Sequence, residues 1–287
     1  MSGVVELAAG ELRLAIDPGD GGRITSLVAA GREWLAPAPR RRPSESFVAA
    51  GTGGWDECLP TVAACTLDGV ALPDHGEAWR RPWRVHSVGA TAAAMSVALD
   101  CLPLHLHRVI ALARGRARID WRLTTTSEVP IPVLWAAHPL FAAPAGTRIE
   151  VAAGSLRAES PDPGRLVRVP AGIDEFGPGR HLKAFATGLD HAAVAVPGGA
   201  RLRLSWHARL LPHLGLYWDR DCYTTQPVVA VEPSTGASDS AAAVRDALPT
   251  VTATAPLAWW LEARAVSQPP PGGSSVRSPS GKEGRHD

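Results

Sequence analysis

Four short segments of the chain combine carboxylate, imidazole and aromatic side chains with glycine or proline. They cover residues 53–60, 72–83, 135–141 and 229–236. Carboxylates and imidazoles are well suited to moving protons near neutral pH, because one can be anionic while the other donates. The types and spacing of these residues therefore point to general acid–base chemistry.

The third and fourth segments each place one ionisable residue in an apolar run and follow it with proline. Glu232 comes after four Val and Ala residues, 228–231, and His138 comes after two alanines. A buried carboxylate is costly unless it is paired or functional. Glu232 is thus either a catalytic carboxylate or a structural one neutralised by a buried arginine. His138 is either functional or a hydrogen-bonded core histidine.

Other kinds of chemistry find less support in the sequence. His105 and His107 have the spacing of two metal ligands on one strand, but residues 108–115 supply no carboxylate to complete a site, so exposed histidines are favoured. The chain has no Walker motif, no Gly-rich phosphate loop and no Gly-x-Ser-x-Gly motif. We expect no metal and no cofactor.

The elements that must position these residues repeat with a period of two. Polar and apolar residues alternate in segments 11–17, 95–101, 116–123, 201–207 and 257–266, as in half-buried antiparallel strands. The 28 glycines and 26 prolines supply turns between such strands. One short helix is predicted over residues 238–248, ended by Pro249. The pattern predicts an all-β fold, a large antiparallel β-sandwich.

Neither an internal repeat nor an interior linker divides the chain. We predict one domain over residues 1–267, followed by a disordered tail over residues 268–287, where Pro, Gly, Ser and charged residues replace apolar ones.

Charge and hydropathy exclude several classes of protein. Lys and Arg total 29 against 28 Asp and Glu, a net charge of +1, which argues against a nucleic-acid partner. The most apolar stretch, residues 129–145, contains four prolines, so no membrane span is expected. The first residues show no secretory signal. The four cysteines lack CxxC or zinc spacing and are expected to be free thiols of a cytoplasmic protein, three of them buried. Oligomeric state is left open.

Taken in order, the four segments resemble the aldose 1-epimerase (galactose mutarotase-like) family. The residues that carry the resemblance are Asp74-His75-Gly76, Ala137-His138-Pro139 and Val231-Glu232-Pro233, with segments 21–27, 31–35 and 213–218 as weaker matches. The resemblance runs from about residue 10 to residue 265. It implies a large antiparallel β-supersandwich, in agreement with the strand pattern.

The resemblance also implies roles for individual residues. Mutarotation opens and recloses a hemiacetal ring, with Glu232 as the base on the C1 hydroxyl and His138 as the acid on the ring oxygen. His75 would hydrogen-bond to the sugar near that oxygen. The partner is a small sugar. Four of the 10 tryptophans lie near the motifs and either stack on the sugar or fill the core: Trp55, Trp79, Trp135 and Trp218. Of these, Trp79 and Trp218 are predicted to contact the substrate.

The chain also departs from the family pattern. The arginine usually found before the His-Gly motif is missing, and Asp56 and Glu57 are predicted to bind sugar hydroxyls there instead. Asp190 loosely matches the family's substrate-binding aspartate. Arg80 and Arg81 either contact a phosphate or form a solvated edge, the latter being favoured. The run Arg40–Arg42 is expected to be solvated.

Two classes of function follow. The favoured one is a mutarotase-like isomerase acting on an aldose or a sugar phosphate. The alternative is a non-catalytic carbohydrate-binding or sensor protein that keeps the fold without turnover.

Overall fold

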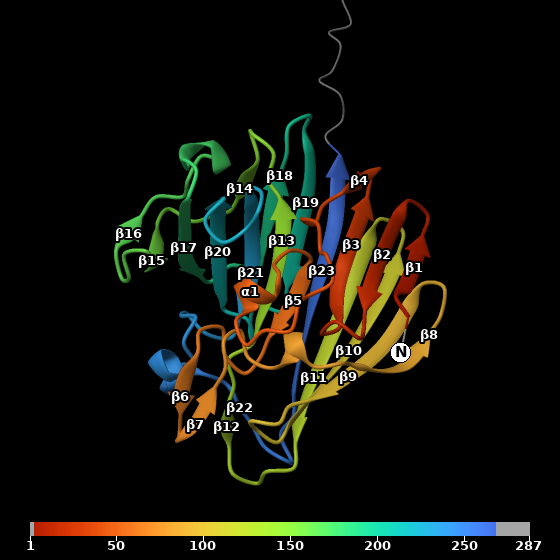
Figure 1. Ribbon diagram of the computed structural model, residues 1–287, viewed down its shortest axis with the longest axis vertical. Coiled ribbons are helices and arrows are strands. Elements are labelled where there is room, and N and C mark those ends of the chain that lie inside the picture. The colour runs from red at the N-terminus through yellow and green to blue at the C-terminus, as the bar shows by residue number, and fades with distance from the viewer. Residues whose placement is uncertain (1–2, 268–287) are drawn as a thin grey trace, which may run out of the picture.

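Two large antiparallel sheets face each other in the computed structural model, which describes residues 3–267 (Figure 1). The first sheet has 11 strands. In spatial order they are β1 (Val5–Ala9), β2 (Leu12–Asp17), β3 (Arg23–Ala29), β5 (Trp55–Cys58), β13 (Ala136–Ala142), β21 (Val228–Ser234), β20 (His213–Arg220), β17 (Arg180–Thr187), β15 (Leu156–Ser160) and β16 (Leu166–Val167), with β4 (Arg32–Glu33) paired to β3.

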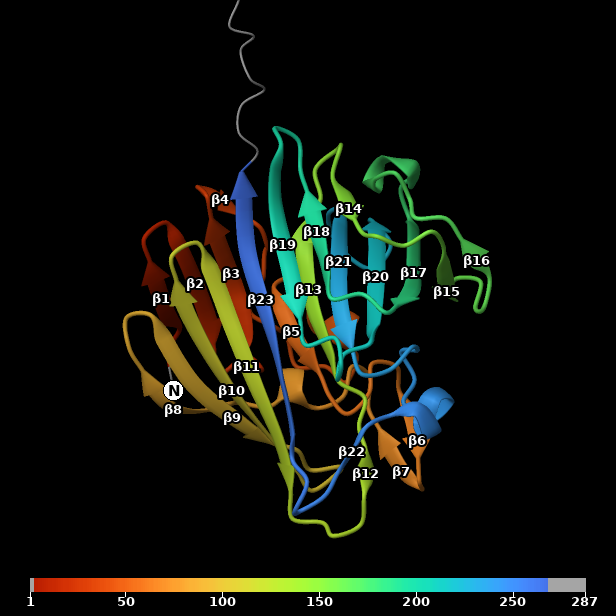
Figure 2. The same cartoon turned by 180° about the vertical axis from the view of Figure 1, so that it is seen from behind.

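The second sheet has eight strands and lies in front when the molecule is seen from behind (Figure 2). Their order is β14 (Arg148–Glu150), β18 (His191–Ala195), β19 (Ala200–Trp206), β23 (Leu257–Ser267), β11 (Arg116–Thr125), β10 (Leu104–Ala113), β9 (Ala92–Ala98) and β8 (Arg84–Val88). Two small pairs complete the structure: β6 (Cys65–Leu67) with β7 (Val70–Leu72), and β12 (Ile131–Pro132) with β22 (Thr250–Val251). The predicted all-β sandwich is confirmed.

The predicted strands form where the alternation places them. On β11, Ala117, Ile119, Trp121 and Leu123 are buried while the residues between them are half-buried or exposed. The segments 11–17, 201–207 and 257–266 correspond to β2, β19 and β23, and segment 95–101 begins within β9 and continues past its end. The predicted tail, residues 268–287, lies outside the described residues.

Helical structure is confined to four short segments of the described chain. They are α1 (Phe47–Ala50) and the 3₁₀ turns η1 (Ala78–Arg80), η2 (Ile173–Glu175) and η3 (Ala242–Ala247). The helix predicted over residues 238–248 was therefore wrong in type and length. Ala241, Val244 and Leu248 pack in a small apolar cluster, but Val244 leaves helical geometry, so the turns do not continue as one helix.

Tryptophan fills the core between the sheets. Nine of the ten tryptophans are at most 3% exposed, and Trp121, Trp135 and Trp259 contact one another with ring centroids 4.9–6.2 Å apart. The tryptophan excess therefore serves packing more than ligand contact. Of the four free cysteines only Cys58 is buried, so the expectation of three buried thiols was wrong.

The first sheet has a second face, turned away from this core. Along β21, Val229 and Val231 belong to the core between the sheets, whereas Val228 and Ala230 pack in a separate small cluster with Leu140. Because side chains alternate along a strand, Glu232 lies on the face of Val228 and Ala230. The segment around α1 lies over this face in Figure 1. No helix within residues 3–267 has the length and hydropathy needed to cross a membrane.

Candidate active site

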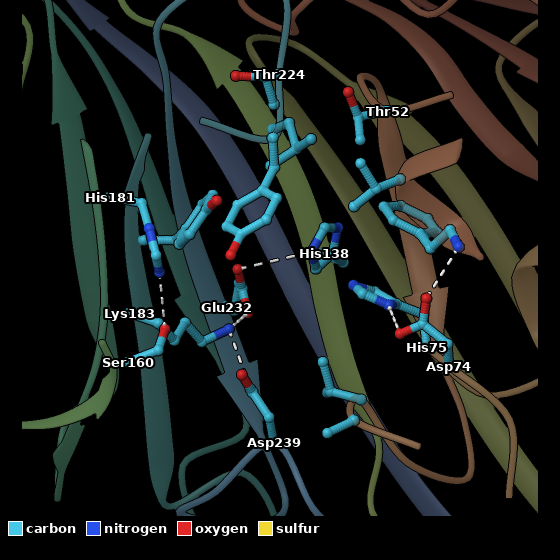
Figure 3. A pocket seen from close by; sticks show the side chains of 17 residues that line it. Thr52, Asp74, His75, His138, Ser160, His181, Lys183, Thr224, Glu232 and Asp239 are labelled. Carbon is cyan, nitrogen blue, oxygen red and sulfur yellow. Dashed lines mark hydrogen bonds and ion pairs between the residues drawn. The ribbon is translucent and has the colours of Figure 1, made fainter. Parts of the chain in front are cut away.

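A pocket of about 270 Å³ opens on this outer face of the first sheet. The floor of the pocket is formed by β13, β21, β20 and β17, which are neighbours in the first sheet. The register of β13 against β21, with Ala136 opposite Ser234 and Leu140 opposite Ala230, places His138 opposite Glu232. Figure 3 shows the side chains that converge: Asp74, His75, His138, Lys183, Glu232 and Asp239.

Glu232 is 1% exposed and its two carboxylate oxygens have different surroundings. Oε2 accepts a hydrogen bond from Lys183 Nζ. Oε1 has no hydrogen-bond partner among the described residues and lies 4.0 Å from His138 Nε2. A buried carboxylate oxygen without a donor, facing a hollow, is the position at which a ligand hydroxyl would be expected.

His138 lies beside this oxygen in a confined environment. Its ring packs edge-on against Phe47 and His75, with centroids 5.2 and 5.1 Å away. Burial, together with His75 and Lys183, holds the pKa of His138 well below its usual value. Its Nδ1 has no partner within the described chain. His138 is therefore neutral near pH 7, with ring nitrogens available to a ligand.

His75 is held by its neighbour Asp74. Asp74 Oδ1 is 2.7 Å from His75 Nδ1, and Phe47 stacks on the imidazole at 4.1 Å. Burial alone would raise the pKa of Asp74, but His75 and the backbone of Phe47 outweigh it, so the pKa is lowered. The residue after His75 must be glycine, since a Cβ on Gly76 would lie 2.0 Å from Leu59 O and its φ is +70°.

Lys183 enters the pocket from β17 and was not predicted as a site residue. Its ammonium pairs with Glu232 and lies 3.3 Å from Asp239 Oδ1. Burial opposes the charge, yet Asp239 and Glu232 together raise the pKa of Lys183 above its usual value. A signal was present in the sequence, because Lys183 is the only lysine within residues 3–267.

Further unpredicted residues form the sides of the pocket. His181 Nε2 is 3.2 Å from Ser160 Oγ, and Tyr217 donates its hydroxyl hydrogen to Asp219 Oδ2 at 3.1 Å. Thr224 and the half-exposed Tyr223 line the rim. Most of these residues come from β15, β17, β20 and the loop after β20, and of these elements only β20 overlaps a segment singled out in the sequence, residues 213–218.

None of the five residues predicted to bind the substrate lines this pocket. Glu57 and Trp218 are fully buried, Asp190 is exposed and pairs with His191, Trp79 donates its indole hydrogen to Asp74 O, and Asp56 pairs with Arg41. Trp79 and Asp56 thus form hydrogen bonds with residues close to the pocket, while Glu57, Trp218 and Asp190 lie elsewhere. Both Trp55 and Trp135 are core residues.

Arg41 occupies an unexpected position. Its side chain is 5% exposed, and its guanidinium lies 5.1 Å from the rings of Phe47 and Trp79. The expectation that the whole run Arg40–Arg42 is solvated was therefore wrong for Arg41, because Asp56 and two aromatic rings provide it with a site. Arg40 and Arg42 are exposed.

Arg80 and Arg81 pair with Glu45 and Asp100 at the surface and are outside the pocket. His105 Nε2 is 3.0 Å from Ser96 Oγ, and His105 and His107 are partly buried rather than fully exposed. Across residues 3–267, no group of three or more His, Cys, Asp or Glu side chains is arranged to hold a metal ion.

Comparison with known proteins relates this chain to others through structure alone. A scan against protein-family models finds no match, and a search of curated proteins finds none either. Solved structures do match. A protein from Synechocystis aligns with a TM-score of 0.78 at 18% identity, covering 93% of this chain and 97% of that one.

Two further matches carry descriptive names. A putative aldose 1-epimerase from Escherichia coli aligns with a TM-score of 0.74 at 14% identity, covering 93% of this chain and 99% of that one. A galactose mutarotase-like protein from Lactobacillus casei gives 0.71 at 16% identity, covering 92% and 100%. The fold is thus galactose mutarotase-like, which confirms the resemblance seen in the sequence at the level of fold.

Proposed function

We propose that the chain is an aldose 1-epimerase-like isomerase, which interconverts the α and β anomers of an aldose. One observation carries the proposal: Glu232 Oε1, buried and without a donor, lies 4.0 Å from His138 Nε2 in a pocket on a mutarotase-like fold. A carboxylate and an imidazole so close together can act on two oxygens of one hemiacetal.

The proposed reaction moves two protons and breaks one bond. Glu232 Oε1 takes the proton of the C1 hydroxyl, the bond between C1 and the ring oxygen breaks, and C1 becomes an aldehyde. His138, as imidazolium, gives its proton to the ring oxygen. Rotation about the C1–C2 bond and the reverse transfers then close the ring as the other anomer. Both side chains regain their starting protonation states, so no cofactor is consumed.

The second imidazole and its carboxylate support this transfer. Asp74 accepts the hydrogen at His75 Nδ1, which leaves His75 Nε2 as its remaining polar atom. In the proposed role, His75 hydrogen-bonds to the sugar near the ring oxygen.

The lowered pKa of His138 means that its acidic form is scarce near neutral pH. We therefore expect the rate to rise as the pH falls from about 8 toward 6.5, by up to about tenfold per pH unit.

Anomer exchange in a panel of aldoses tests the proposal. Freshly dissolved sugars are followed by polarimetry or by NMR exchange, with wild-type protein and with Glu232→Gln. We expect wild type to accelerate equilibration of at least one aldose and the variant to do so far less. Saturable sugar binding with no exchange, unaffected by the substitution, would instead establish the carbohydrate-binding alternative.

Phosphorylated sugars belong in the same panel because of a neighbouring hollow. It has a volume of about 420 Å³, shares Val48, Thr52, Tyr223 and Thr224 with the pocket, and is lined by Arg40 and Arg42 but by no Asp or Glu. This observation favours a sugar phosphate as the second candidate substrate. Arg40→Ala with Arg42→Ala would then raise KM for the phosphorylated sugar and leave KM for the neutral sugar unchanged.

The four free thiols support a cytoplasmic setting for either reaction.

A further inference from the structure

A single ammonium group joins two carboxylates at the floor of the pocket. Lys183 Nζ pairs with Glu232 Oε2 and lies 3.3 Å from Asp239 Oδ1. The side chains of Lys183 and Glu232 are 6% and 2% exposed, and the Lys183 ammonium also lies 5.6 Å from the centre of the Phe185 ring. This ion pair is therefore largely removed from water.

The neighbouring strand is shaped around this pair. Gly215 on β20 lies opposite Glu232, and a Cβ at this position would meet both Glu232 Oε2 and Lys183 Cε at 3.2 Å. Gly215 does not have a positive φ, so its backbone conformation does not require glycine. Space for the ion pair is the constraint that the structure shows here.

Ionisable side chains from several elements surround Glu232. The ionisable groups around it are Lys183 from β17, Asp239 from the loop before η3, His138 from β13, Cys58 from β5 and Tyr217 from β20, and His75 packs against His138. Lys183 is the one permanent cation in this set. Asp239 brings a second carboxylate, whose pKa is raised by burial and by Glu232 although Lys183 opposes the shift.

We infer that Lys183 is a positioning residue, which balances the charge of Glu232 inside the pocket and binds Oε2 so that Oε1 alone faces the substrate. The inference rests on the proposed function, because it assigns Glu232 the role of base. Without the ammonium, Glu232 and Asp239 would be two like charges near each other at the floor of the pocket, and such a neighbour favours the protonated form of one carboxyl. A protonated Glu232 cannot take the proton of the C1 hydroxyl.

The first test compares pH–rate profiles of anomer exchange. Lys183→Met removes the charge but keeps most of the apolar stem, and Lys183→Arg keeps the charge. We expect Lys183→Met to move the acid limb of kcat/KM upward by about one to three pH units. Lys183→Arg should return the limb toward the wild-type position even if its absolute rate stays low. An unchanged acid limb in Lys183→Met would overturn the inference.

Asp239→Asn serves as the matched control in the same assay. It removes the second carboxylate but leaves the ion pair between Lys183 and Glu232. The acid limb should therefore move less than in Lys183→Met. If Asp239→Asn shifted the acid limb as far upward as Lys183→Met, both shifts would result from a general disturbance of the pocket, and the inference would be wrong.

The second test does not depend on activity. Melting temperatures are measured for wild type, Lys183→Met, Glu232→Gln and the double variant. We expect Lys183→Met to lower the melting temperature by leaving a buried carboxylate without its cation, and Glu232→Gln to reverse part of this loss in the Lys183→Met background. Strictly additive effects would overturn the inference. If the melting temperatures show coupling between Lys183 and Glu232 but no anomer exchange is measurable, the ion pair is confirmed and the proposed function is wrong.

Discussion

Two buried glutamates on opposite faces of the same sheet show how different a buried carboxylate can be. Glu57 on β5 faces the core, where Oε1 accepts hydrogen bonds from Arg108 Nη1 and Trp121 Nε1, both at 3.0 Å, and Oε2 accepts one from Trp135 Nε1 at 2.9 Å. Glu232 on β21 faces the pocket, with one oxygen bound to Lys183 and the other without a donor.

This comparison separates burial from function. Glu57 and Glu232 are 0% and 1% exposed, so burial alone does not distinguish them. The difference lies in hydrogen-bond capacity. Every oxygen of Glu57 is satisfied by a rigid core donor, whereas Glu232 keeps an acceptor available beside an imidazole and a hollow. An unsatisfied polar atom next to a cavity is thus the better indicator of a ligand site.

The largest expected effect concerns the pocket carboxylate. Glu232→Gln should lower the rate of anomer exchange by about 100- to 10,000-fold, because the amide cannot take the C1 proton. The melting temperature should change little, since the amide keeps the shape and can still accept from Lys183. Rate and thermal melting are measured on the same preparation. A large fall in melting temperature with an unchanged rate would assign Glu232 a structural role and break the comparison.

The core carboxylate should show the opposite behaviour. Arg108→Met leaves Glu57 buried without its cation, and the free energy of unfolding should fall by about 3–5 kcal/mol. The rate per folded molecule should stay near that of wild type, because neither residue lines the pocket. Urea denaturation and single-concentration exchange assays measure the two quantities. Loss of rate without loss of stability would contradict the structural role.

The pH dependence of stability sharpens the same contrast. Burial raises the pKa of Glu57 from 4.5 to about 7, against the effect of Arg108 and the two indoles. Because the folded protein then binds the proton more tightly than the unfolded chain, this contribution to stability is complete below pH 4.5 and is lost as the pH rises to about 7. The loss should reach at most about 3 kcal/mol.

Chemical denaturation across this pH range checks the effect, with Glu57→Gln as the matched control. The glutamine variant has no proton to bind at this position, so its stability should vary less between pH 4.5 and about 7. Equal pH dependence in wild type and Glu57→Gln would show that Glu57 titrates alike in the folded and unfolded chain.

The smallest effect is expected at an exposed carboxylate. Asp190 pairs with His191 at the surface, its side chain is 73% exposed, and it is not part of the pocket. Asp190→Asn should change the free energy of unfolding by less than about 0.5 kcal/mol and should not alter the exchange rate. A marked rise in KM would place the substrate far from Glu232 and require a different site.

The two-residue alternation of polar and apolar side chains explains why much of the fold and part of the site could be predicted from the sequence. Alternation gave the strands and the all-β fold, and the motifs gave Glu232, His138 and His75, which the structure brings into one pocket. The same alternation also separates neighbours in sequence. Asp56 and Glu57 point to opposite faces of β5, as do Tyr217 and Trp218 on β20, and only one member of each pair is on the pocket side. Sequence proximity to a motif was therefore a poor guide to substrate contacts.

By itself, the sequence determined the strands, their amphipathic pattern and the isolated ionisable residues of β13 and β21, because these depend on local periodicity and on the cost of placing charge among apolar neighbours. Only the tertiary structure decided which charges meet. Lys183 and Glu232 are 49 residues apart, and Asp239 comes shortly after Glu232, but their contact depends on strand order and register. Arg108 reaches Glu57 across 51 residues in the same way. Long-range pairing is a property of how the sheets assemble, and no local pattern encodes it.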